Sequence, residues 1–167
     1  MDINNNWKNM TNKNTGKIPH YTESIFYELK QTARMMKFHA TQQFALMNID
    51  IAPEEYSALD TIMCNPGLCQ RDLAKLLLLD RANTGRILNR LEDKKLIKRS
   101  VDTKKNRLIK KVQITKCGEK KLEEINNKIV HKFMKITEKI PREEFDSVKL
   151  AIKKLRKNLE EHIENKI

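Results

Sequence analysis

The chain has 167 residues, 39% of them hydrophobic and 34% charged, with only four Gly and four Pro. That length allows one domain with a buried core, and that composition favours a helix-rich soluble fold. The longest apolar run, residues 76–79, is far too short to span a bilayer, and the N-terminus lacks the apolar core of a signal peptide. We therefore expect a cytoplasmic protein with no membrane partner. Three Cys, an odd number, argue against a disulfide framework.

Positive charge is concentrated in one quarter of the chain. The formal net charge is +12, and residues 81–121 alone contain 15 Lys or Arg against four acidic residues, a net of +11. Residues 1–80 and 122–167 carry only −1 and +2. A solvated Lys-rich surface would spread its charge more evenly. The concentration therefore predicts a polyanionic partner for this segment.

The first predicted elements are an arm and a long helix. Residues 1–20 are rich in Asn and are typical of a flexible arm. Over residues 22–48, apolar side chains then recur at alternating steps of four and three. This spacing predicts one long amphipathic helix with a single apolar stripe.

Three shorter helices are expected next. Pro53 followed by two Glu is a helix start, because Pro tolerates the first position and carboxylates suit the positive end of the helix dipole. That helix ends at an Asn-Pro-Gly turn, residues 65–67. A short helix over 70–77 follows, and Asp80 is a good N-cap for the next helix, over 81–94.

After these helices the pattern changes to strands and then returns to helices. Residues 96–101 and 108–114 are predicted strands, joined through the polar and basic residues 102–106 as a β-hairpin. A second long helix is expected to open at Gly118, and Pro141 with two Glu restarts a third.

Three helices followed by a basic hairpin are the element order of a winged helix-turn-helix. In that arrangement the second helix of the turn lies in the major groove, and the wing touches phosphates or the minor groove. On the predicted helix 81–94, Thr84, Leu88 and Leu91 share one face and should pack inward. The opposite face carries Ala82, Asn83, Arg86 and Arg90, and Asn and Arg side chains can contact adenine and guanine edges. The sequence therefore predicts a reading helix on a mainly α fold with a small β-hairpin wing.

Four ordered segments now make a resemblance specific. They are QRDLAK (70–75), LDRANTGRILNRLE (79–92), KLIKR (95–99) and ITKCG (114–118). In this order they resemble the MarR family of transcriptional regulators, and with the flanking helices the match covers about residues 22–165. The resemblance implies a homodimer, a double-stranded DNA operator as partner, and a small-molecule or oxidant cue that releases DNA.

The resemblance also implies a division of the chain. Residues 1–20 are then an arm, 53–116 the winged helix-turn-helix domain, and 21–52 with 117–167 the long dimerisation helices. These helices carry apolar stripes too extended for the winged core alone, although an intramolecular helical bundle is the competing interpretation. Two-fold pairing would set two reading helices about 34–36 Å apart, one turn of DNA.

Site residues follow from the residues and the resemblance together. In the wing, Lys105 stands where the family usually has an acidic residue, so Arg107, Lys104 or Lys105 could supply the wing contact. Leu78 stands where the family often has a helix-ending Gly, and Cys69 where it often has a capping Ser or Thr. The expected DNA-binding residues are Arg81, Ala82, Asn83, Gly85, Arg86, Arg90, Lys98, Arg99, Lys104, Lys105 and Arg107. The expected effector pocket, for a small aromatic or lipophilic ligand, is Met36, His39, Phe44, Tyr56 and Leu59.

Other functions have weaker signals in the sequence. Cys64 and Cys69 bracket a turn and could form a redox switch, or could simply pack as small hydrophobes. The four His lack metal-ligand spacing, so we expect no metal and no cofactor. Phosphate-loop, metalloprotease and nucleophile motifs are absent, which argues against an enzyme. A non-specific nucleic-acid-binding architectural protein is the remaining alternative, but the basic segment has no aromatic residue on which single-stranded bases could stack.

Overall fold

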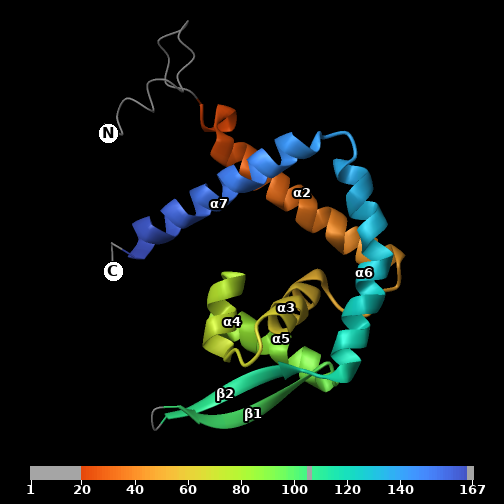
Figure 1. Ribbon diagram of the computed structural model, residues 1–167, viewed down its shortest axis with the longest axis vertical. Helices are drawn as coiled ribbons and strands as arrows, with labels where there is room; N and C mark the ends of the chain where they lie inside the picture. Colours follow the sequence, from red (N-terminus) through yellow and green to blue (C-terminus); the bar gives the residue numbers. More distant parts are fainter. Residues whose placement is uncertain (1–19, 105–106, 165–167) are drawn as a thin grey trace, which may run out of the picture. The chain divides into compact units, whose positions relative to one another are not determined.

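A computed structural model describes residues 20–104 and 107–164 (Figure 1). The chain divides into two compact units, Met1–Glu119 and Lys120–Ile167. The first unit begins with η1 (Tyr21–Glu23), a short 3-10 helix, followed by α2 (Ile25–Leu46), α3 (Pro53–Cys64), α4 (Gln70–Leu77), α5 (Arg81–Asp93), β1 (Ile97–Lys104) and β2 (Arg107–Ile114). Helix α6 (Lys116–Thr137) starts in the first unit and continues into the second, which ends with α7 (Arg142–Glu164). The described fold is mainly α with one β-hairpin, as the sequence predicts.

Local signals fix where the helices begin. Ser24 is the N-cap of α2, and its hydroxyl oxygen accepts the backbone N–H of Tyr27 at 3.3 Å. Pro53 occupies the first turn of α3, where its missing N–H leaves no hydrogen bond unmade. Asp80 caps α5 by accepting the backbone N–H of Asn83 at 2.7 Å. The short helices therefore start where the sequence predicted them.

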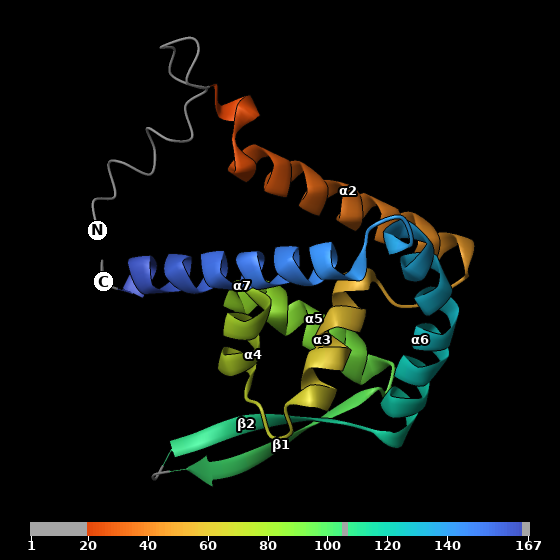
Figure 2. The same cartoon turned by 45° about the horizontal axis from the view of Figure 1, so that its top comes forward.

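Helices α3, α4 and α5 pack against one another and against the hairpin (Figures 1 and 2). Each helix contributes one apolar stripe, and the stripes meet in a core that is almost completely shielded from water. Its largest fully buried apolar side chains in these helices are Leu59, Ile62, Leu73, Ile87, Leu88 and Leu91. Burying each of these side chains contributes on the order of 1.5–3 kcal/mol, so this core holds α5 firmly in place.

The hairpin is longer than predicted. Its strands pair antiparallel from Ile97 opposite Ile114 to Lys104 opposite Arg107, so residues 102–104 extend β1 instead of forming a loop. The prediction of a loop was wrong at residues 102–104 because it relied on polarity, and the residues of a hairpin strand can be polar. Leu68 and Cys69 add a short third stretch to the sheet. Cys69 forms an antiparallel bridge with Lys111, and the Leu68 carbonyl accepts an N–H from β2 at 2.8 Å.

The sequence predicted that α6 begins at Gly118, and this prediction was wrong. The helix begins at Lys116, after Thr115, whose hydroxyl oxygen accepts the Gly118 N–H at 3.1 Å. Gly118 has a different role, since a Cβ atom built on it would lie 2.2 Å from the Leu96 carbonyl oxygen. The Gly is therefore required by a close backbone approach between α6 and the start of the hairpin.

Helix α7 has an apolar stripe that its own unit does not bury. Side chains at helical spacing are between 36% and 59% exposed on it, namely Phe145, Val148, Ile152, Leu159 and Ile163. Across the part of the chain that the structure describes, no helix is long and apolar enough to cross a membrane. By its helical spacing, the stripe forms one face of an amphipathic helix.

Candidate nucleic-acid interface

Helix α5 is fixed on its α4 side by Gln70. The Gln70 side-chain amide donates to the Arg81 carbonyl at 3.2 Å. A Cβ atom added to Gly85 would lie 3.2 Å from Gln70 Nε2, so the absence of a side chain at Gly85 makes room for Gln70. Between the two helices Leu78 adopts a left-handed conformation with φ of 53°, which Gly adopts at a lower energetic cost. Gln70, which the sequence reasoning did not single out, therefore helps to set the helix-turn-helix geometry.

The faces of α5 are sharply divided. Thr84, Leu88 and Leu91 are fully buried, as predicted. The exposed face opposite them carries side chains at spacings of four, three and four residues, which are Ala82, Arg86, Asn89 and Asp93. Arg81 and Arg90 are also exposed, whereas Asn83 and Gly85 are half-buried at the flanks. Ala82 and Arg86 are therefore exposed on one face, and Asn89 shares that face although it was not predicted.

On the α3 side, Arg90 is held by a buried carboxylate. Glu55 is only 3% exposed, and its Oε1 lies 2.7 Å from Arg90 Nε. Its Oε2 lies 3.5 Å from Lys94 Nζ and accepts the backbone N–H of Ala52 at 3.1 Å. Lys94 also donates to the Asp50 carbonyl. Glu55 therefore caps α3 and ties it to the C-terminal half of α5, and part of the Arg90 guanidinium is engaged inside the protein.

On the wing side, Arg99 links β1 to α5. Its backbone N–H and its Nε donate to the Glu92 carboxylate at 3.1 and 2.8 Å, and Nη2 makes a further contact with Glu92. The same Nη2 donates to Asn89 Oδ1 at 2.9 Å. The hydrogen bond and charge of Arg99 hold the pKa of Glu92 below its usual value. Arg99, predicted as a phosphate contact, is thus bonded to two side chains of α5.

Two basic side chains of the hairpin reach solvent. Lys98 on β1 and Lys110 on β2 are exposed. The side chains of Lys104 and Arg107, and the whole of Lys105, lie outside the described residues. The wing contact predicted for one of these three therefore stays a prediction.

The two candidate redox cysteines differ in their surroundings. Cys64 is exposed at the end of α3, and Cys69 is half-buried just before α4. The Cys69 thiol donates to the Asp72 carboxylate at 3.0 Å, and this hydrogen bond is the main cause of the lowered Asp72 pKa. Neither thiol is part of a disulfide.

The predicted effector-pocket residues occupy neighbouring parts of α2 and α3. Phe44 and Leu59 are buried, and the Phe44 and Tyr56 rings meet edge to face with centroids 5.8 Å apart. His39 is half-buried and Met36 is 60% exposed. Burial, followed by the nearby charge of Asp60, raises the Tyr56 pKa. The five residues thus combine packed aromatic rings with groups that reach the surface.

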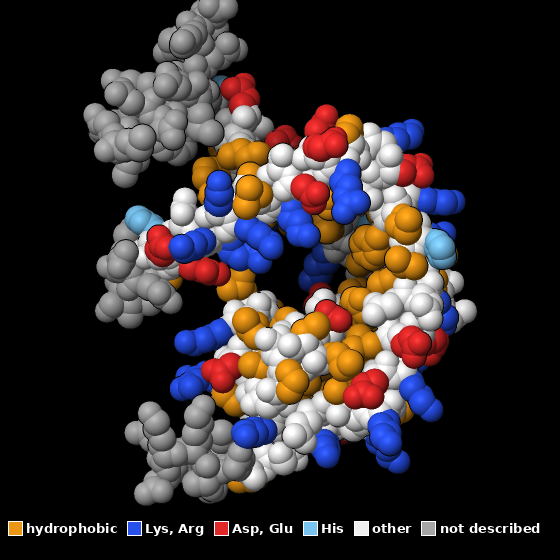
Figure 3. All heavy atoms as spheres, viewed as in Figure 1, with side chains coloured by type: hydrophobic (Ala, Val, Ile, Leu, Met, Phe, Trp, Pro, Cys, Tyr) orange, Lys and Arg blue, Asp and Glu red, His pale blue; other side chains and the backbone are white. Residues whose placement is uncertain are grey.

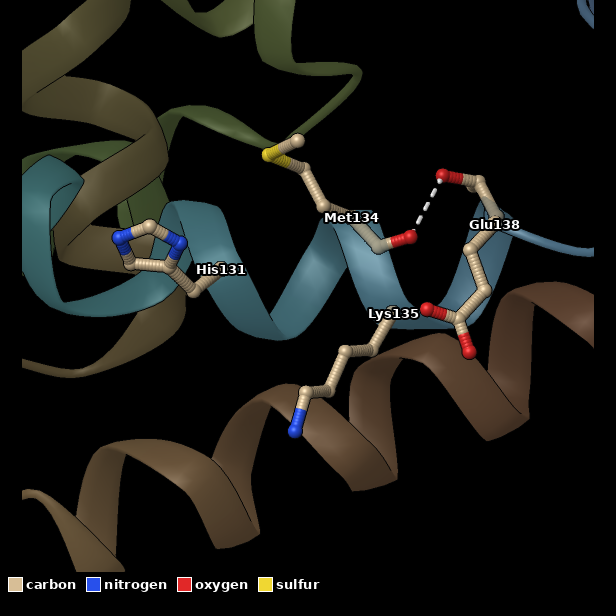
Figure 4. A pocket seen from close by; sticks show the side chains of 5 residues that line it. His131, Met134, Lys135 and Glu138 are labelled. Carbon is tan, nitrogen blue, oxygen red and sulfur yellow. Dashed lines mark hydrogen bonds between the residues drawn. The ribbon is translucent and has the colours of Figure 1, made fainter.

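A surface hollow of about 380 Å³ lies elsewhere, at the C-terminal end of α6 (Figure 4). The sequence did not predict it. Its lining comes from one stretch of chain, and a hydrogen bond of 3.2 Å joins the Thr137 hydroxyl to the Met134 carbonyl. The lining residues are His131, Met134, Lys135, Thr137 and Glu138. Within the described residues, no three His, Cys, Asp or Glu side chains come together as a possible metal site.

Helices α3, α4 and α5 with the hairpin β1–β2 form a winged helix-turn-helix, in which α5 has the position of the recognition helix. This is the architecture of a DNA-binding domain. Comparison with known proteins agrees: residues 51–109 match the sequence model of the MarR family. The chain is also 26% identical over 136 residues to the uncharacterized HTH-type transcriptional regulator YybA of Bacillus subtilis (strain 168). This match covers 81% of this chain and 89% of YybA.

Solved structures share the same architecture. The S. aureus MepR–DNA complex is 26% identical with a TM-score of 0.68, and the match covers 84% of this chain and 99% of MepR. A MarR protein from Peptoclostridium difficile shares the fold at 18% identity, with a TM-score of 0.72 over 89% of this chain and 95% of that protein. Residues 51–109 thus form a MarR-type winged helix-turn-helix, and the chain resembles DNA-binding transcriptional regulators over most of its length.

Proposed function

We propose that this regulator is a repressor that binds a pseudo-palindromic double-stranded DNA operator as a homodimer. The observation that carries the proposal is the exposed face of α5, on which Ala82 and Arg86 are both exposed. An Arg on such a face can donate two hydrogen bonds to guanine O6 and N7. The resemblance of this chain to MepR, whose structure was solved in complex with DNA, supports DNA as the partner.

Unburied apolar surface supports a second copy as the other partner. Helix α7 buries none of its described side chains, and its stripe is exposed. On α2, Met35, Met36 and Phe38 are between 60% and 72% exposed. Apolar side chains are visible at the surface between charged ones in Figure 3. Exposed apolar side chains along a helix are typical of a protein interface, and two-fold pairing would present two copies of α5 to two operator half-sites.

The first experiment is a footprint on the promoter beside the protein's own gene, with Arg86→Ala compared with wild type. Removing the Arg86 side chain should weaken operator binding by about 1–3 kcal/mol. Arg142→Ala is the matched control, because Arg142 is 94% exposed at the start of α7, far along the chain from the recognition helix. Equal operator affinity for Arg86→Ala and wild type would exclude Arg86 from the reading face. Diffuse, length-dependent DNA binding by the wild type would instead favour the architectural-protein alternative.

The release signal is proposed to be a small aromatic or lipophilic molecule held by the α2 and α3 residues around the Phe44–Tyr56 pair. Their mixture of apolar surface with the Tyr56 hydroxyl and the His39 ring suits a phenol or aromatic carboxylate. Titration of the protein–operator complex with such compounds should release DNA. A redox signal through Cys64 or Cys69 predicts release by peroxide, and loss of that response in Cys64→Ser or Cys69→Ser.

A further inference from the structure

The side chain of Asn89 is oriented by its neighbours. It lies on the exposed face of α5, three residues after Arg86, which is about 4.5 Å further along the helix axis. Its Oδ1 accepts the hydrogen bond from Arg99 Nη2 at 2.9 Å. Arg99 is itself held by the Glu92 carboxylate through its backbone N–H and its guanidinium. The amide of Asn89 is therefore hydrogen-bonded to an Arg99 side chain that Glu92 holds in place.

Chemistry decides which end of this amide faces outward. A guanidinium has only hydrogen-bond donors, so the oxygen of the amide must face Arg99. The Nδ2 group, with its two N–H donors, then points away from Arg99. In the ordinary Asn–adenine pair the amide oxygen accepts from adenine N6 while the nitrogen donates to N7. In this protein the oxygen is already engaged, so Asn89 offers mainly donors.

We propose that Asn89 is a further base-reading residue, which donates from Nδ2 to an acceptor atom in the major groove, and that Arg99 is its positioning residue. This inference rests on the proposed binding of a duplex operator by α5. Suitable acceptors are guanine O6 and N7, adenine N7 and thymine O4. Cytosine presents an amino donor instead, so it is the base that Asn89 rejects. Guanine, with two adjacent acceptors, fits best.

Substitutions at Asn89 give a sharp test against a panel of operators carrying every single base-pair change. Asn89→Ala should weaken operator binding about three- to tenfold, as expected for one hydrogen bond, and abolish the rejection of cytosine at one position in each half-site. Asn89→Asp keeps an oxygen towards Arg99, so the protein should melt no lower than wild type. Its second oxygen accepts hydrogen bonds, so the preference at that position should change to cytosine.

Controls separate base reading from charge and from folding. Asn127→Asp on the exposed surface of α6 adds the same negative charge on a different helix and should leave the base preferences unchanged. Arg99→Lys keeps the charge but loses the geometry that joins Glu92 to Asn89. It should weaken discrimination at the same base pair as Asn89→Ala, and have no additional effect on that base pair in the double variant.

The outcomes that overturn the inference differ from those that overturn the proposed function. An unchanged base profile in both Asn89→Ala and Asn89→Asp, with Arg86→Ala still impaired, would reject the role of Asn89 and leave the operator proposal intact. Equal loss at all positions in Arg99→Lys would reject the positioning role. Absence of any base preference in the wild type would instead reject the proposed function itself.

Discussion

The buried carboxylate of Glu55 gives the most demanding test of how this fold holds its recognition helix. Glu55→Gln keeps the size of the side chain and an oxygen that can accept the Ala52 N–H, but removes the charge that faces Arg90 and Lys94. Breaking a fully buried ion pair costs about 3–5 kcal/mol. Arg90 and Lys94 side chains are 56% and 36% exposed here and can regain water. We therefore expect a smaller loss of stability, about 2 kcal/mol.

Thermal unfolding at a fixed protein concentration measures this loss. For a chain of this size, about 2 kcal/mol corresponds to a decrease in Tm of about 4–8 °C. The adjacent Glu54 provides the matched control. It forms an ion pair with Lys37 at 2.9 Å, but its side chain is 42% exposed. Glu54→Gln should therefore change stability by less than about 1 kcal/mol.

Two results would refute this reasoning about Glu55. One is an equal decrease in Tm for Glu55→Gln and Glu54→Gln, because burial of the carboxylate would then not affect its contribution to stability. The other comes from a double-mutant cycle between Glu55→Gln and Arg90→Gln. The cycle should give a coupling energy of at least about 0.5 kcal/mol, and simple additivity would mean that the 2.7 Å contact contributes nothing. Operator affinity should fall with stability in Glu55→Gln, because the C-terminal half of α5 loses its attachment to α3.

Three further predictions concern single positions. Leu78→Gly should raise the free energy of unfolding by about 1 kcal/mol, because the Leu78 backbone is in the left-handed region and its side chain is 78% exposed. Chemical denaturation measures this change, and a destabilised variant would contradict it. Gly118→Ala should destabilise the fold by about 1–3 kcal/mol in the same assay, since its methyl group would collide with the Leu96 carbonyl, and wild-type stability would disprove the close approach. Arg99 lowers the Glu92 pKa in the folded state, so this pair stabilises the protein above the usual carboxyl pKa of 4.5 and loses that effect as the pH falls through the lowered value. The stability difference between wild type and Glu92→Gln should therefore shrink on acidification, and a difference that grows would reverse the assigned sign.

Much of the fold could be predicted because its signals are local. The cap at Asp80, the Pro at the start of α3 and the apolar spacing within α5 are each contained in a few neighbouring residues. Prediction was wrong where polarity was used as a sign of a loop, at residues 102–104. It was also wrong at Gly118. This Gly is required by the close approach of the Leu96 carbonyl and does not mark a helix start. That contact joins two elements, so no local pattern could reveal it.

The candidate site was predicted less completely than the fold. Spacing alone placed Arg86 on the face opposite the core, and the same spacing extended by three residues would have found Asn89. No spacing rule could distinguish Arg86 from Arg90, because both lie on polar parts of one helix. The carboxylate that separates their roles comes from α3.

The sequence by itself determined the order of the elements and the segment that carries the positive charge, because these depend on periodicity, caps and composition. Its motifs also carried the resemblance to the MarR family. Only the tertiary structure decided which polar groups of that segment are already used within the protein. Arg90 is bound by Glu55, and Arg99 is bound by Glu92 and Asn89. The physical reason is that a charged side chain near another element exchanges water for a fixed partner, and a linear sequence does not show which elements will become neighbours.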